Sequence, residues 1–250
     1  MSDQLSLLLE TDRLPDLPDL RPMQPRPLPE AFDSAEHLFE PWWGGVRALA
    51  LIGPADAPGD GVVRIVDAEG LDLSAALPEL AGMAVRVAAR SAILDGELVV
   101  VDAAGRADQA TLAARLAGGE GRPAAFLAFD LLHLDGRSLL TTPLARRREM
   151  LRKVLRPGDE VVAVPAIATE GRALYDAAVA QGIAGILARQ RMSPYLPGIR
   201  SRLWRFVAAT PGSAAPGPES PSGDDGELPP PTAAAPVLAL ISRLPLDDEL

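Results

Sequence analysis

The sequence predicts an α+β protein built on antiparallel β-sheet. Strand-like segments outnumber helix-like segments along the 250 residues, and neighbouring strands are joined mostly by turns rather than by helices. The strongest strand signal, residues 124–134, is followed by Asp135-Gly136, a dipeptide that accepts the positive φ angles of a tight hairpin turn. Long crossover helices between neighbouring strands are not evident, so parallel sheets are not expected.

The remaining elements follow from local patterns. Short apolar runs bounded by Gly, Pro or Asp predict strands over 46–52, 62–66, 92–101, 185–189 and 202–208. Helices are predicted over 74–80 with Ser74 as cap, over 109–116, and over 143–155 with Pro143 in the first turn. A last helix over 169–180 has Thr169 as its expected N-cap and Gly182 as its stop.

Charge and composition divide the chain into three regions. The formal net charge is −10, but residues 31–209 hold 21 acids against 20 bases, so the acidic excess lies in the two ends. We expect a disordered lead-in over 1–22, a folded body over 23–208, and a disordered Pro/Ser/Asp-rich tail over 209–250. Within that tail, the apolar stretch 237–246 is expected to fray, with docking to a partner as the alternative.

Several classes of protein are disfavoured by what the sequence lacks. There is no cysteine, which excludes disulfides and thiolate metal sites, and we expect no metal site. No basic segment leads an apolar core at the N-terminus, and no apolar run approaches the ~20 residues that a membrane helix needs. We therefore expect a cytoplasmic protein that does not engage a membrane.

One motif resembles a known attachment site except at its reactive position. Residues 39–47 are Phe-Glu-Pro-Trp-Trp-Gly-Gly-Val-Arg, which resembles the Glu-Pro-Lys-Trp-Asp-Gly-x-Arg motif of ATP-dependent DNA ligases. In that family the lysine attacks the α-phosphate of ATP and carries AMP. Trp42 stands at the lysine position and Gly44 at the aspartate position, and the chain's single lysine is Lys153.

Further segments resemble the same family in its order and at roughly its spacing. Residues 94–99 resemble the Asp-Gly-Glu motif, whose glutamate faces the ribose and the metal, and 126–138 contain the Phe-Asp-Leu-Leu segment, whose phenylalanine packs on adenine. Residues 184–189 resemble Glu-Gly-x-x-x-Lys, and 193–201 followed by Trp204 are typical of the bacterial repair-type ligases. This resemblance over residues 23–208 implies an ATP-grasp-like adenylation (nucleotidyltransferase) domain, with two antiparallel sheets, flanking helices and a cleft between them. Too few residues follow for the OB-fold domain of active ligases, so none is expected.

The resemblance also sorts the cleft positions into retained and degenerate ones. It implies a nucleotide cleft formed by Glu40, Arg47, Glu97, Phe129 and Arg189, of which Arg189 replaces a lysine. The positions that lose their chemistry are Trp42, Gly44, Ala184 (glutamate in the family), and Phe206 and Ala208 (lysines in the family); Ala68 likewise replaces an arginine.

Adenylyl transfer depends on the groups that are missing. It needs an amine in line with the α-phosphate, and cations that stabilise the charge developing there. The indole nitrogen of Trp42 has no free lone pair, and losing one stabilising group typically costs about 2.7–4 kcal/mol in the transition state. We expect Trp42 to fill the vacated pocket; stacking of Trp42 on a nucleobase is the alternative.

Three functions remain open. The leading hypothesis is a pseudoenzyme, linked to DNA repair, that binds an unknown protein partner or weakly a nucleotide. The second is an active ATP-dependent DNA ligase that uses ATP and Mg²⁺. The third is a nucleic-acid-binding accessory protein, supported by a basic helix that carries Arg146, Arg147, Arg148 and Arg152, although an ordinary solvated helix face is the commoner explanation and DNA binding is expected to be weak or absent.

Overall fold

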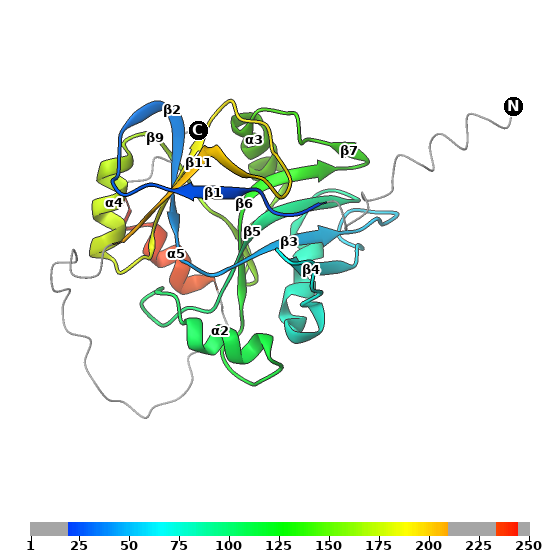
Figure 1. The fold of residues 1–250 in the computed structure, drawn as a ribbon. Coiled ribbons are helices and arrows are strands. Elements are labelled where there is room, and N and C mark those ends of the chain that lie inside the picture. The colour runs from blue at the N-terminus through cyan, green and yellow to red at the C-terminus, as the bar shows by residue number, and fades with distance from the viewer. Residues whose placement is uncertain (1–19, 210–233, 245–250) are drawn as a thin grey trace, which may run out of the picture.

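The structure, a computed structural model, describes residues 20–209 and 234–244. Two β-sheets form the centre of the fold and helices surround them (Figure 1). The first sheet has five strands in the order β1 (Gln24–Pro27), β11 (Arg200–Ala208), β10 (Gly185–Gln190), β2 (Ser34–Trp42) and β9 (Ile167–Thr169). The second has six, of which five run in the order β4 (Val63–Asp67), β3 (Val46–Ile52), β5 (Ala92–Val99), β6 (Ala125–Leu134) and β7 (Arg137–Ser138), while β8 (Val161–Ala163) pairs with β6.

The α+β class with two largely antiparallel sheets is confirmed. Two pairings depart from it, because β1 runs parallel to β11 and β8 runs parallel to β6. In both cases the partners are far apart in sequence, so no tight turn dictates an antiparallel approach.

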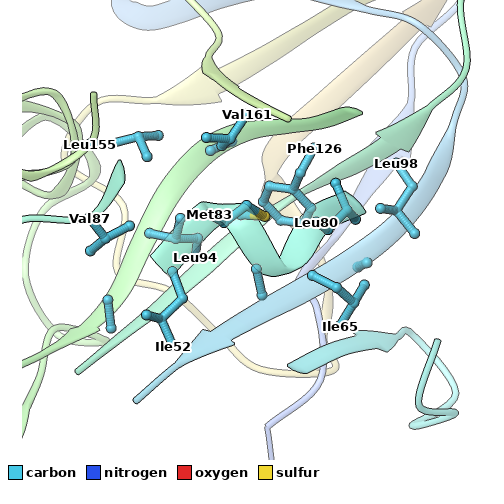
Figure 2. Close-up of a cluster of buried hydrophobic side chains, with 14 of the residues drawn as sticks. Ile52, Ile65, Leu80, Met83, Val87, Leu94, Leu98, Phe126, Leu155 and Val161 are labelled. Atoms are coloured by element: carbon cyan, nitrogen blue, oxygen red, sulfur yellow. The ribbon is translucent and has the colours of Figure 1, made fainter. Parts of the chain in front are cut away.

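A hydrophobic cluster covers the outer face of the second sheet. Because successive strand side chains alternate between faces, Ala48, Ala50 and Ile52 of β3 all point to this side. They pack against Leu80 and Met83 of a 3₁₀ helix, Pro78–Arg86 (Figure 2). The helix is therefore held by its apolar face rather than by a capped end.

The inner faces of the two sheets pack against each other. Leu49 and Leu51 of β3 belong to one buried cluster with Trp204 of β11 and with Tyr195. Residues of both sheets also line the cavity described below.

The α-helices lie around the sheets. They are α2 (Gln109–Leu116), α3 (Leu144–Val154), α4 (Gly171–Ala180) and α5 (Ala235–Ile241). The predicted bounds of 109–116 and the positive φ angles of Asp135 (44°) and Gly136 (79°) are confirmed, as is Gly182 after α4 (φ 72°). No helix within residues 20–209 and 234–244 is long and apolar enough to cross a membrane.

Two helix starts were predicted wrongly. Ser74 does not cap a helix over 74–80; two 3₁₀ helices occupy Ser74–Ala76 and Pro78–Arg86, and the Ser74 hydroxyl accepts from the Ile65 amide instead. Thr169 is not an N-cap but the last residue of β9, with φ 79°, and α4 begins at Gly171. Ser74 contacts β4, and Thr169 pairs with Ser34 of β2, so both residues are used by strand contacts that sequence reasoning did not anticipate.

The expected disorder of the C-terminal tail is corrected for residues 234–244. α5 lies against the body (Figure 1), and its apolar side chains Val237 and Leu240 are buried with Val101, Ile183 and Val207. The apolar stretch therefore docks on its own chain rather than fraying. Residues 210–233 and 245–250 lie outside the described part, as do residues 1–19 of the expected lead-in, whereas Leu20 is already buried.

Candidate functional site

The strand register places most of the predicted cleft positions on one face of the first sheet. Across β2, β10 and β11, Glu40 is level with Leu187 and Phe206, and Trp42 is level with Gly185 and Ala208. Residues two apart on a strand share a face, so these rows stack on the same side of the sheet. The structure thus brings together the attachment position and the two former lysine positions.

A cavity of about 170 Å³ opens beside these rows. Both sheets contribute to it: Trp42, Leu187, Phe206, Gln24, Pro25 and Arg200 come from the first sheet, and Arg47, Glu97 and Phe129 from the second, with Gly45 between them. Small-molecule sites usually measure about 300–1,000 Å³, so the cavity is small for a nucleotide.

Trp42 occupies the position of the attachment lysine and is half-buried. Its ring centroid lies 5.3 Å from that of Phe206, with the ring planes tilted by 57°. Two glycines follow it. Gly44 has φ 74°, and a Cβ on Gly45 would lie 2.1 Å from the Leu98 carbonyl, so only glycine fits at Gly45. The two aromatic rings therefore form an apolar wall where the family has cations.

Glu97 is buried and both of its carboxylate oxygens are already engaged. Oε1 accepts from the Trp43 amide at 2.9 Å and Oε2 from the Gly45 amide at 3.1 Å. Burial raises the pKa of Glu97 to about 7, against the two amides and Arg47, which favour the charged form. The glutamate expected to face a ribose and a metal holds the backbone of the attachment loop instead.

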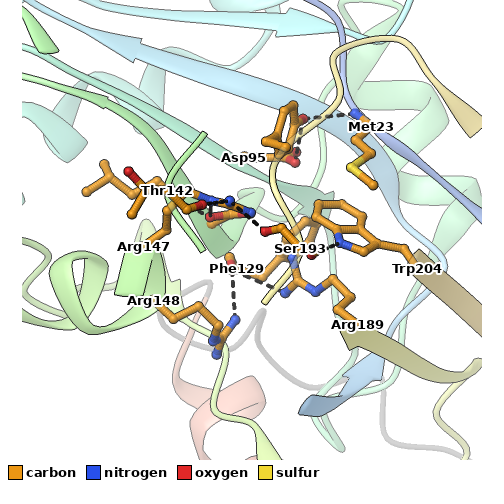
Figure 3. A network of polar contacts seen from close by, with 12 residues as sticks. Met23, Asp95, Phe129, Thr142, Arg147, Arg148, Arg189, Ser193 and Trp204 are labelled. Atoms are coloured by element: carbon orange, nitrogen blue, oxygen red, sulfur yellow. Dashed lines mark hydrogen bonds and ion pairs between the residues drawn. The ribbon is translucent and has the colours of Figure 1, made fainter. Parts of the chain in front are cut away.

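Arg47 is held by a carboxylate of the neighbouring strand. Its Nε and Nη2 donate to Asp95 at 2.6 and 2.5 Å, a bidentate pair in which Asp95 is fully buried. Asp95 also accepts from the Tyr195 hydroxyl at 2.8 Å, and that hydroxyl in turn accepts from the Met23 amide (Figure 3). Burial alone would lower the pKa of Arg47, but Asp95 outweighs it and the pKa lies above its ordinary value.

The ring of Phe129 is already covered by guanidinium groups. Arg47 Cζ lies 4.4 Å and Arg189 Cζ 4.6 Å from its centroid, and Arg189 also lies 4.9 Å from the Trp204 ring. Cations stack favourably on aromatic faces, so an adenine approaching Phe129 would compete with these contacts.

Glu40 and Arg189 form the centre of a buried ion cluster. Both are fully buried and paired with each other, and Arg148 Nη1 lies 2.8 Å from the other Glu40 oxygen. Arg189 also donates to the Phe129 carbonyl at 3.1 Å, and Arg148 donates to the same carbonyl at 2.7 Å (Figure 3). Nε and Nη1 of Arg189 have no hydrogen-bond partner within the described residues. One carboxylate thus balances two guanidinium groups inside the protein.

The prediction that four arginines of one helix are available to grip phosphates is wrong for Arg147 and Arg148, which are buried. Arg147 of α3 is fully buried, with a bidentate pair to Asp130 at 2.8 and 2.7 Å, and it also donates to the Thr142 and Ser193 carbonyls. Arg148 is buried at the Glu40 cluster. Arg146 and Arg152 are exposed, so only they remain available to a phosphate backbone. The arginines therefore lie on both the buried and the exposed face of α3, and residue type alone does not show which arginine lies on which face.

The remaining positions lie beside the cavity or outside it. Ala184 approaches the attachment loop, because a Cβ on Gly44 would lie 3.2 Å from its own Cβ. Ala208 is exposed, and Lys153, the single lysine, is exposed near the end of α3 and does not line the cavity.

Sequence reasoning missed the buried partners of the cleft arginines. Asp95 and Asp130 each lie inside a mainly apolar, buried strand, β5 or β6. An acid in such a strand needs a partner when it is buried, so it was the available signal. Tyr195 and Trp204 complete the set, and their roles depend on contacts that are distant in sequence.

Comparison with known proteins decides the family. A family model described as ATP dependent DNA ligase domain matches residues 28–205. The chain belongs to this family. It contains an adenylation domain of the bacterial repair type, and the two-sheet fold is that of the family's adenylation domains.

The relatives are larger proteins. A multifunctional non-homologous end joining DNA repair protein LigD of Mycobacterium tuberculosis is 33% identical over 171 residues, which cover 68% of this chain and 21% of LigD. DNA ligase C1 of Mycolicibacterium smegmatis is 34% identical over 208 residues, covering 75% of this chain and 56% of that protein.

Two solved structures extend the comparison. A mycobacterial DNA ligase D complexed with ATP and MES is similar with a TM-score of 0.65 and 28% identity, covering 77% of this chain and 61% of that one. A Chlorella virus DNA ligase-adenylate shares the fold, with a TM-score of 0.50 and 14% identity, covering 74% of this chain and 67% of that one.

The cleft residues do not fit the ATP and Mg²⁺ that the family implies. Ala184 has no carboxylate, and both oxygens of Glu97 accept backbone amides. Within residues 20–209 and 234–244, no group of three or more His, Cys, Asp or Glu side chains could hold a metal ion. Phe206 and Ala208 provide no positive charge for phosphates.

Proposed function

We propose that this chain is a non-catalytic member of the DNA ligase family that acts as a binding module for a protein partner, or weakly for a nucleotide, in DNA repair. The observation that carries the proposal is Trp42, whose ring stands against Phe206 where an amine must stand for adenylation. The link to repair comes from relatives named as non-homologous end joining DNA repair proteins.

The rest of the cleft supports the same conclusion. Glu40, Arg47, Glu97 and Arg189 are all engaged by other protein groups, so among the described residues none of these four offers an unpaired charge to a triphosphate in the cavity. Arg200, at the cavity wall, donates to the Pro25 carbonyl at 3.2 Å. Rebuilding one of these positions alone would not restore the electrostatic stabilisation that phosphoryl chemistry needs.

Intact-mass spectrometry after incubation with ATP and Mg²⁺ tests the proposal. We expect an unmodified mass for the wild-type chain and also for Trp42→Lys, because the introduced amine lacks the neighbouring cations. An active ligase in the same buffer serves as the positive control. An AMP adduct on the wild-type chain would overturn the proposal, and loss of that adduct in Lys153→Arg would locate it.

A nucleic-acid-binding role has less support than the helix sequence suggested. Arg147 and Arg148 are committed to buried partners, which leaves Arg146 and Arg152 on the exposed face. We expect DNA binding to be weak or absent in a filter-binding titration at several salt concentrations. A steep fall in affinity with rising salt would instead support the accessory role, since phosphate contacts release counterions.

A further inference from the structure

A second, smaller hollow lies between α3, β2 and the turn that follows β10. Its volume is about 50 Å³, and none of its lining residues borders the main cavity. Leu38, Ala145 and Ala166 provide apolar surface. Arg148, Arg152 and Arg191 also line it, and we call the hollow the arginine pocket. The guanidinium group of Arg148 is already bonded to Glu40 and to the Phe129 and Val164 carbonyls, so the charge that is open to a ligand comes from Arg152 and Arg191.

Backbone contacts fix the positions of the segments that carry the pocket arginines. Arg148 and Arg152 lie one helical turn apart, so they share a face of α3. The Ala145 amide donates to the Arg191 carbonyl at 2.9 Å, and the Leu144 amide donates to the Ser193 carbonyl at 3.0 Å. These bonds fix the turn that carries Arg191 to the start of the helix.

Two of the three pocket arginines have no bonded counter-charge in the part of the chain that the structure describes, whereas Arg148 is paired with Glu40. Within the described residues, no hydrogen bond or ion pair engages the side chain of Arg152 or of Arg191. The one lining carboxylate, Glu149, is held by Arg146 at 2.5 Å. The pKa of Arg148 is lowered by burial, against Glu40, and further by the nearby Arg189 and Arg152. An anion entering here would relieve repulsion among cations.

We infer that the arginine pocket binds a single phosphate group. The hollow of about 50 Å³ is several times the minimum of roughly 10–15 Å³ that admits one water, a space on the order of one tetrahedral oxyanion. Guanidinium forks match phosphate oxygens bidentately and stay charged at every physiological pH. Free phosphate and the terminal phosphate of a nucleic-acid strand offer this same chemistry.

Calorimetric titration of the full chain with inorganic phosphate tests the inference. We expect saturable binding to the wild type, and at least a tenfold weaker affinity in the double variant Arg152→Gln/Arg191→Gln. Both side chains reach solvent and neither has a bonded partner in the described residues, so the fold should persist; circular dichroism checks this. The matched control is Arg156→Gln, an exposed arginine just beyond α3 that does not line the pocket, for which we expect less than a twofold change.

A variant of opposite sign makes the test stricter. Glu149→Gln removes the only lining carboxylate and should strengthen phosphate binding several-fold. Competition by a 5′-phosphorylated oligonucleotide, but not by the same strand without its phosphate, would support the inference with a nucleic-acid end as the source. Competition by neither strand would support it with free phosphate as the ligand. Absence of saturable phosphate binding, or equal binding by wild type and the double arginine variant, would overturn it.

Discussion

The structure of the Glu40 cluster predicts that substituting Glu40 lowers the free energy of unfolding much more than substituting its partner Arg189. Glu40→Gln keeps the shape of the side chain but leaves Arg148 and Arg189 buried with no carboxylate between them. Breaking a buried pair by removing one partner costs about 3–5 kcal/mol, because an uncompensated charge remains inside. Here two such charges remain, so we expect a loss of at least that size from the free energy of unfolding.

Arg189→Met should cost much less. It leaves Glu40 paired one-to-one with Arg148, and it removes Nε and Nη1, two buried donors without partners, each of which costs about 1–3 kcal/mol. Against this, the contacts of Arg189 with the rings of Phe129 and Trp204 are lost, about 0.5–2 kcal/mol each. The two effects are similar in size, so the net change should lie within about 1 kcal/mol.

Urea unfolding followed by far-UV circular dichroism measures both changes without depending on the tryptophans near the cluster. The double variant Glu40→Gln/Arg189→Met should recover part of the stability lost in Glu40→Gln, since it removes one of the two stranded cations. Equal losses for the two single variants, or a Glu40→Gln loss below about 1 kcal/mol, would refute the assignment of Glu40 as the shared counter-charge.

Three further predictions concern the attachment loop and α5. Burial raises the pKa of Glu97 from 4.5 to about 7, so between these values the folded state binds more protons than the unfolded state. The free energy of unfolding should therefore fall by up to about 3 kcal/mol as the pH rises from 4.5 to about 7, and then level off. Glu97→Gln should remove this pH dependence. Leu240→Ala should lower the free energy of unfolding by about 2–5 kcal/mol if α5 unfolds together with the body. If α5 detaches first, the loss should be smaller, and amide exchange should rise around Gly105 while β5 and β6 stay protected. Gly105→Ala should give the same exchange pattern, because the new Cβ would lie 2.5 Å from the Pro236 carbonyl at φ 83°; unchanged exchange in both variants would show that α5 does not support this turn.

The elements predicted well from sequence are those specified by local chemistry. The apolar run 46–52 forms β3 with the same bounds, and the Asp135-Gly136 turn has the positive φ angles that its residues permit. β2 was not predicted, because Glu36, Glu40 and Pro41 interrupt its pattern. Burial of its central acid, Glu40, depends on Arg148 and on Arg189, and Arg189 is 149 residues away in the sequence.

The sequence predicted where the cleft residues lie more accurately than it predicted what each residue contacts. Motif order located Trp42, Glu97 and Phe129 around one cavity. It did not indicate that Arg147 and Arg148 are buried, since that depends on Asp130 and on carbonyls that only the folded chain brings near. The docking of α5 was missed for the same reason, because its apolar residues need the surface formed by Val101, Ile183 and Val207.

Cleft positions that match the family differ from most altered ones in how many contacts they make inside the domain. Positions that match the family are engaged within the domain: Glu40 by two arginines, Arg47 by Asp95, Glu97 by two backbone amides, and Phe129 by two guanidinium groups. Four altered positions have at least part of their surface exposed at or beside the cavity, namely Trp42, Ala184, Phe206 and Ala208, whereas Arg189, which replaces a lysine, keeps the charge and is buried. Stability therefore accounts for Glu40, Arg47 and Glu97, since removing any of them would strand a buried charge or donor, and for Phe129 through its contacts with two guanidinium groups. The four exposed altered positions have no such contacts to preserve within the described residues, which is the pattern expected under our proposal that the domain keeps its fold without transferring AMP.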